Sequence, residues 1–108
     1  MNRYYILDEK GNPKPAANVH EWGRFFEDNK KIVAQDTIGH CWVSTVFLGL
    51  DYNFTGKGPP ILWETMVFVH VGHPLHQECD RCSGNREQAE AMHKAMIERV
   101  EAVLALQE

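Results

Sequence analysis

Hydrophobic and polar residues follow two different spacings along the chain, and each spacing predicts one kind of element. Short runs of branched and aromatic residues, bounded by Gly, Pro and Asn, favour β-strands at residues 3–8, 31–36, 41–50 and 61–71. Apolar residues three or four positions apart predict amphipathic helices over residues 18–29 and 85–104. The remaining segments are predicted to be turns or loops.

Both predicted helices begin with the same sequence signature. Asn18 is followed three residues later by Glu21, and Asn85 is followed in the same way by Gln88. In a capping box of this kind the first side chain accepts a hydrogen bond from the helix backbone, and the second reaches back to the cap residue. The apolar stripe of the second helix consists of Ala89, Met92, Met96, Val100, Val103 and Leu104.

The run at residues 61–71 is apolar on both faces, because Trp63 and Val67 alternate with Leu62 and Phe68. We therefore expect a central strand that is covered on both sides. The segment that follows, up to Gly84, is predicted to be irregular. The resulting order, β-α-β-β-β-α, predicts the α+β class: a small antiparallel sheet with two helices packed on it.

The composition narrows the range of functions. A chain of 108 residues, 44% of them hydrophobic, predicts a single domain over residues 1–108. No apolar run approaches the roughly 20 residues of a membrane-spanning helix, so no membrane partner is expected. The net charge of −4, from 11 Lys and Arg against 15 Asp and Glu, argues against direct nucleic-acid binding. Three cysteines form no complete disulfide framework, which favours a reducing cytoplasm.

Four potential metal ligands stand three residues apart: His73, His76, Cys79 and Cys82. Two imidazoles and two thiolates can complete a tetrahedral zinc site, in which His70, or the pair His40 and Cys41, could replace one ligand. Zinc is therefore the one cofactor that the sequence suggests, with the structural role of tying this connection to the sheet. Two alternatives stay open: exposed, unrelated side chains, or a redox dithiol, although a thioredoxin-like dithiol opens a helix directly and this pair does not.

Catalytic chemistry finds little support in the sequence. His40 and Cys41 are neighbours at the start of a predicted strand, so their side chains point to opposite faces and cannot readily pair. Cys41 is predicted to be buried, and Glu64 to face solvent or to pair with a Lys or Arg. Residues 56–58, Gly-Lys-Gly, join two strands, whereas a phosphate-binding P-loop joins a strand to a helix. We therefore predict no catalytic residues and no enzymatic activity.

The loop at residues 53–60 is the predicted site of partner binding. Two Gly and two Pro in eight residues exclude a continued strand there. Tyr52 and Phe54 stand at its start, and aromatic side chains are enriched at protein interfaces. We predict Tyr52, Phe54 and Lys57 as partner-binding residues, with a place in the core as the alternative for the two aromatic side chains.

Several segments together resemble those of a group of small uncharacterised bacteriophage and prophage proteins, also found in bacterial mobile elements. The segments are residues 4–8, 22–26, 43–51, 58–68 and 87–96, of which 44–51 and 59–68 are the most specific. The resemblance covers most of the chain and implies the cytoplasm of an infected or lysogenic host cell. The group carries no assigned activity or cofactor. Its members often have a short connection with Pro and Leu before the last helix, where this sequence has the His and Cys residues, so the resemblance does not imply zinc.

These observations lead to one preferred function and two alternatives. We expect a non-enzymatic phage or mobile-element protein that binds a host or phage protein, for example an anti-CRISPR-like inhibitor of a host defence complex. The first alternative is a small zinc-stabilised structural or regulatory domain that uses His73, His76, Cys79 and Cys82. The second is an enzyme with a cleft between sheet and helices that uses His40, Glu64 or a cysteine. A homo-oligomer is compatible with all three.

Overall fold

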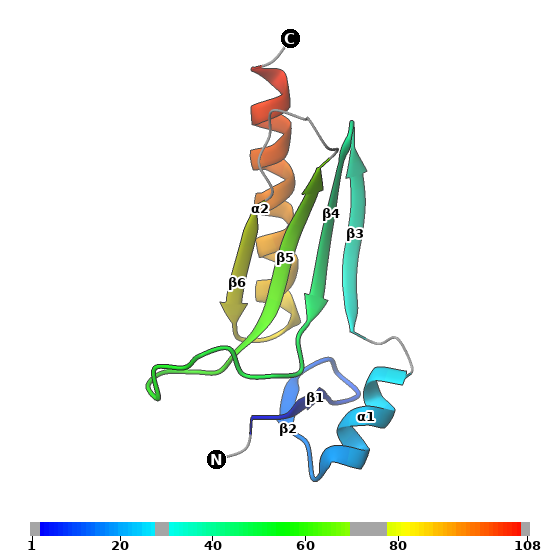
Figure 1. Ribbon diagram of the computed structural model, residues 1–108, viewed down its shortest axis with the longest axis vertical. Coiled ribbons are helices and arrows are strands. Elements are labelled where there is room, and N and C mark those ends of the chain that lie inside the picture. The colour runs from blue at the N-terminus through cyan, green and yellow to red at the C-terminus, as the bar shows by residue number, and fades with distance from the viewer. Residues whose placement is uncertain (1–2, 28–30, 70–77, 107–108) are drawn as a thin grey trace.

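The computed structural model describes residues 3–27, 31–69 and 78–106 and confirms the α+β class (Figure 1). Two of its strands, β2 and β6, are additions to the predicted order. The elements are β1 (Tyr5–Leu7), β2 (Pro13–Pro15), α1 (Val19–Glu27), β3 (Ile32–Ile38), β4 (Cys41–Phe47), β5 (Ile61–Val69), β6 (Cys79–Ser83) and α2 (Arg86–Ala105). Within the described ranges, no helix is long and apolar enough to cross a membrane.

Four strands form an antiparallel sheet in the order β3-β4-β5-β6, with neighbours in sequence also neighbours in space. The β3–β4 hairpin turns through Gly39 and His40, and Gly39 supplies the positive φ, +58°, that this tight turn requires. Helix α2 crosses one face of the sheet and contacts all four strands (Figure 1). The sheet and α2 therefore form two layers with the core between them.

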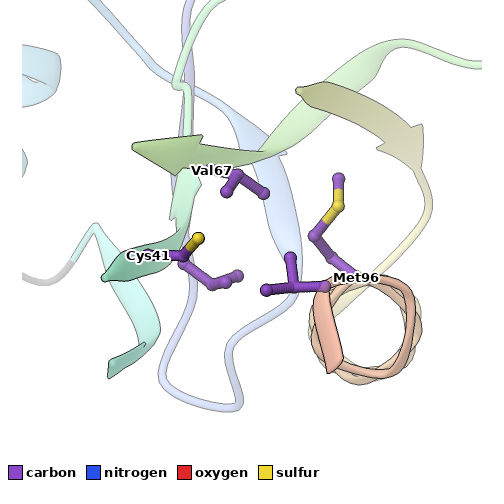
Figure 2. Packing of buried hydrophobic residues seen from close by; sticks show 5 residues of the cluster. Cys41, Val67 and Met96 are labelled. Carbon is purple, nitrogen blue, oxygen red and sulfur yellow. The ribbon is translucent and has the colours of Figure 1, made fainter. Parts of the chain in front are cut away.

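The core divides into two clusters along α2. In the first, Cys41 and Val43 of β4 and Val67 of β5 meet Met96 and Val100 of α2, and each is at most 1% exposed (Figure 2). The prediction that Cys41 is buried is confirmed. Full burial of an aliphatic side chain of this size contributes about 1.5–3 kcal/mol, so this cluster holds α2 to the sheet. The second cluster, nearer the start of α2, consists of Phe47, Leu62, Trp63 and Ala89.

Helix α1 and the small β1–β2 sheet lie at one end of the main sheet (Figure 1). Phe25 and Phe26 of α1 pack against Phe47, with ring centroids 5.8 and 6.2 Å away. The Trp22 indole Nε1–H donates to the carbonyl oxygen of Gly49 at 3.0 Å. A short aromatic contact thus joins α1 to the end of β4 rather than to the face of the sheet.

Both predicted helix starts are found. The Asn85 side chain accepts from the N–H groups of Glu87 and Gln88, and the Gln88 side chain accepts from the Asn85 N–H at 2.9 Å, which completes a capping box. In α1, the Asn18 side chain accepts from the Glu21 N–H at 2.9 Å. The Glu21 carboxylate there reaches one residue further back than predicted, to the Ala17 N–H.

Two predictions about the sheet need correction. Strand β5 is central, but no helix or strand among the described residues covers the face opposite α2; Trp42 and Phe68 on that face are each 39% exposed. The segment up to Gly84 is not wholly irregular, because residues 79–83 pair with β5 as strand β6. This strand has no apolar alternation to reveal it, since its central residues Asp80 and Arg81 bind charged partners instead.

Candidate functional site

The loop between β4 and β5 is held in shape by its own side chains. One Asp51 carboxylate oxygen accepts from the N–H groups of Asn53 and Ile61, at 2.7 and 3.0 Å. The Asn53 amide donates to the carbonyl oxygens of Lys57 and Pro59, at 2.7 and 2.9 Å, and so bridges the loop. Asn and Asp fix turns in this way because their short side chains reach nearby backbone groups. The loop extends well beyond the edge of the sheet (Figure 1).

Tyr52 and Phe54 come together on this loop, with ring centroids 6.0 Å apart. The Arg3 guanidinium carbon lies 4.8 Å from the Phe54 ring centroid, and the Arg81 guanidinium carbon lies 4.8 Å from that of Tyr52. We call these four side chains the aromatic platform. Phe54 is 72% exposed, so the alternative of a core position is wrong for it, whereas Tyr52 is half-buried.

Sequence reasoning identified the two rings but missed both arginines. Arg3 and Arg81 come from the N-terminal segment and from β6, far from the loop in sequence. No local sequence pattern predicts that they contact the two rings. Lys57, the third residue predicted to bind a partner, lies exposed in the same loop. Its ammonium forms no ion pair within the part of the chain that the structure describes.

The aromatic platform continues onto the uncovered face of the sheet, which we call the open face. The Arg81 guanidinium Nε donates to the Glu64 carboxylate at 2.7 Å, which confirms the predicted pairing of Glu64 and raises the pKa of Arg81. At the opposite end of the open face the Trp42 and Phe68 rings lie 5.0 Å apart. A second exposed aromatic pair therefore lies at the end of the open face that is farther from the aromatic platform.

Of the four predicted zinc ligands, only Cys79 and Cys82 fall within the described residues; His73 and His76, like His70, lie outside them. The two cysteines occupy opposite faces of β6. The Cys79 thiol is on the open face, 3.5 Å from the Glu64 carboxylate, while Cys82 packs against the second core cluster on the α2 side. The described residues contain no group of three side chains that could hold a metal ion. The described residues therefore do not form a zinc site by themselves, and zinc binding stays a prediction.

The same placement bears on the redox alternative. Burial raises the pKa of both thiols, and the Glu64 carboxylate adds to the shift at Cys79. A reactive dithiol needs a lowered pKa and two sulfurs that can meet. Cysteines three positions apart in a strand are separated by about 10 Å, beyond the reach of a disulfide.

A chain of polar side chains crosses the core between the sheet and α2. His93 Nε2 lies 2.7 Å from the Asp36 carboxylate, and His93 Nδ1 lies 2.7 Å from the Thr45 hydroxyl. The Thr45 hydroxyl also lies 2.5 Å from that of Thr65. With the ring proton on Nε2, His93 donates to Asp36 and accepts from Thr45. Each buried polar atom of these four side chains then has a partner.

An acid, an imidazole and a hydroxyl in this order recur in hydrolase triads. Here Thr45 is fully buried and His93 is 5% exposed, so no substrate reaches the hydroxyl. We assign the row of hydrogen-bonded side chains from Asp36 to Thr65 the role of holding α2 on the sheet. Sequence reasoning missed His93, although Ala89, His93, Met96 and Val100 are spaced four, three and four residues apart, as a buried stripe requires.

A surface cavity of about 540 Å³ lies between the β1–β2 turn, α1 and the start of α2. Two of its four charged side chains are already engaged: the Asp8 carboxylate accepts from the N–H groups of Lys10 and Asn12, and Arg86 binds Glu90. These backbone hydrogen bonds, led by that of Asn12, lower the pKa of Asp8. The lining residues are Leu7, Asp8, Glu9, Lys10, Gly11, Phe25, Ile32 and Arg86, which include neither a cysteine nor Glu64 nor His40.

No protein-family model matches the chain, and no curated protein and no solved structure matches it either.

Proposed function

We propose that this protein acts without catalysis, by binding a host or phage protein through the aromatic platform and the adjoining open face. The observation that carries the proposal is the exposure of Phe54, 72%, on a loop whose backbone is fixed by Asn53. An ordered loop loses little conformational entropy on binding, and a rigid aromatic side chain buries much apolar area at once.

The size of an ordinary interface also supports this surface. A stable protein complex buries about 800 Å² on each partner, more than one loop supplies. The open face offers the remaining area beside the aromatic platform, with Trp42 and Phe68 as a second aromatic pair. A partner that reaches both pairs would cover the sheet opposite α2.

Site-specific photo-crosslinking tests the proposal. A benzoylphenylalanine in place of Phe54 should crosslink to one discrete protein in a bacterial host, with or without phage infection. Co-purification of that protein with the unlabelled chain should be lost in Phe54→Ser. The matched control is Val19, an apolar side chain that is 56% exposed and belongs to a different element, α1. Equal crosslinking from positions 54 and 19 would refute a specific surface.

The narrower version, inhibition of a defence complex such as a CRISPR effector, has its own assay. Expression of the protein should restore plaque formation by a targeted phage, and Phe54→Ser should remove the effect while Val19→Ser does not. If plating efficiency does not change in a host where the crosslinked partner is present, the binding proposal stands and defence inhibition does not.

A further inference from the structure

The surroundings of the aromatic platform carry the opposite charge to the chain as a whole. The chain has a net charge of −4, yet Arg3 and Arg81 lie over the Phe54 and Tyr52 rings, and Lys57 lies exposed in the same loop. The two nearby carboxylates are engaged internally. Asp51 accepts backbone N–H groups of the loop, and Glu64 accepts from Arg81 and Cys79. Arg81 and Glu64 pair with each other, so the three cations and the two carboxylates leave this end of the molecule with a net charge of +1.

Both arginines are held in place before any partner arrives. Each guanidinium lies over a ring of the platform, and Arg3 is further held by a hydrogen bond of 3.2 Å to the Asp51 carbonyl oxygen. A stacked guanidinium loses less side-chain freedom on binding, and its five N–H donors exceed the bonds made here. Arginine donors that remain available match carboxylate oxygens in geometry and in charge.

We propose that the aromatic platform binds an acidic segment of a protein partner, with carboxylates on Arg3, Arg81 and Lys57 and an apolar side chain against Phe54. This inference rests on the proposed function and specifies the chemistry of the partner. A single-stranded nucleic acid is the other anionic candidate, but it would need ring faces on which bases can stack. Guanidinium groups already occupy one face of each ring, and three cations are few against the six to ten phosphate contacts of typical binders.

The probe for this proposal is a fluorescein-labelled peptide in which Glu and Asp alternate with Leu and Phe. Its binding to the full chain, followed by fluorescence anisotropy, should weaken as salt is raised, because exposed charge pairs are screened. Arg3→Gln and Lys57→Gln should each weaken binding about two- to fivefold, and the charge reversal Arg3→Glu with Lys57→Glu by more than tenfold. The matched control, Lys94→Gln on the exposed side of α2, should leave the affinity unchanged.

Three results would overturn the acidic partner. The first is that a peptide with Lys in place of Glu and Asp binds equally well. The second is that an oligothymidylate binds more tightly than the acidic peptide. The third is that the charge-reversed variant binds the acidic peptide with unchanged affinity. The proposed function fails separately, because it depends on Phe54→Ser and on crosslinking from position 54. If that crosslink forms and is insensitive to charge reversal, the protein-binding surface stands and the acidic partner is wrong.

Discussion

At the scale of single residues, Thr45 is the side chain on which the buried polar chain depends. Its hydroxyl forms hydrogen bonds with both His93 and Thr65, whereas the Thr65 hydroxyl bonds only to Thr45 among these side chains. Thr45→Val keeps the shape but strands both neighbours, at a cost of about 1–3 kcal/mol for each buried group left unpaired. Thr65→Val removes one bond and should cost about 1 kcal/mol.

Urea unfolding of the two single variants and the double variant measures this difference. The double variant should cost less than the sum of the singles, because Thr65→Val removes the hydroxyl that Thr45→Val strands. Thr37→Val, at an exposed position of β3, is the control and should change the free energy of unfolding by less than about 0.5 kcal/mol. Equal costs for Thr45→Val and Thr65→Val would contradict the proposed order of hydrogen bonds.

Cys79 is exposed, yet its thiol should react slowly with iodoacetamide. Partial desolvation and the Glu64 carboxylate raise its pKa, so less of the reactive thiolate is present at neutral pH. Glu64→Gln should accelerate alkylation of Cys79 several-fold at pH 8, as followed by peptide mass spectrometry, whereas Glu98→Gln on α2 should not. An unchanged rate in Glu64→Gln would show that the carboxylate does not act on the thiol.

The raised thiol pKa values also fix the sign of one pH dependence. Cys41, Cys79 and Cys82 all hold their protons more tightly in the folded chain than an ordinary thiol does. The unfolded chain therefore loses protons first as the pH rises, and stability should fall above about pH 8.5.

At the scale of elements, the join between α1 and the main sheet depends on one glycine. Gly49 has φ +72°, and a Cβ there would collide with the Phe26 ring and lie 2.9 Å from the Trp22 Nε1. Gly49→Ala should therefore lower the free energy of unfolding by at least about 2 kcal/mol, because the strain and the clash occur together. Thermal unfolding measures the loss.

Gly23, inside α1, is the matched control for this prediction. A Cβ at Gly23 meets no atom within 4 Å, so Gly23→Ala should stabilise the helix by up to about 1 kcal/mol. If the two alanine variants unfold at the same temperature, the close approach at Gly49 does not hold α1 in place.

Strand β6 sharpens the untested zinc prediction, because one ion could bind both Cys79 and Cys82 only if this strand opened. With β6 intact, a cobalt titration should give at most the absorbance of one thiolate per ion, and the β6 pairing should persist in amide exchange. Absorbance from two thiolates, lost in both Cys79→Ser and Cys82→Ser, would show that metal binding rebuilds this edge of the sheet.

At the scale of the whole molecule, the spacing of apolar residues predicted the β3–β4–β5 meander and α2 because burial on one face sets that spacing. The same logic could not reveal β6, whose Asp80 and Arg81 are satisfied by Arg99 and Glu64 rather than by the core. The apolar pattern of β5 also led to the wrong prediction that an element packs on both of its faces. An apolar strand face has the same sequence pattern whether it contacts a helix of the same chain or a partner.

The candidate site was predictable only in its local part. Tyr52, Phe54 and Lys57 lie in one loop whose composition marks it, whereas Arg3 and Arg81 reach it through the tertiary fold. The resemblance to phage and prophage proteins stays a prediction.

The three tryptophans lie in three different environments: the core, the junction between α1 and the sheet, and the open face. Each can therefore serve as a fluorescence reporter of its own region. Trp63 is fully buried with its indole N–H on the Gly84 carbonyl, Trp22 is half-buried where α1 meets the sheet, and Trp42 is 39% exposed on the open face. Variants that keep one tryptophan and replace the others with Phe would emit at separate wavelengths. A blue shift confined to Trp42 on complex formation would then show how far a partner extends from the loop across the sheet.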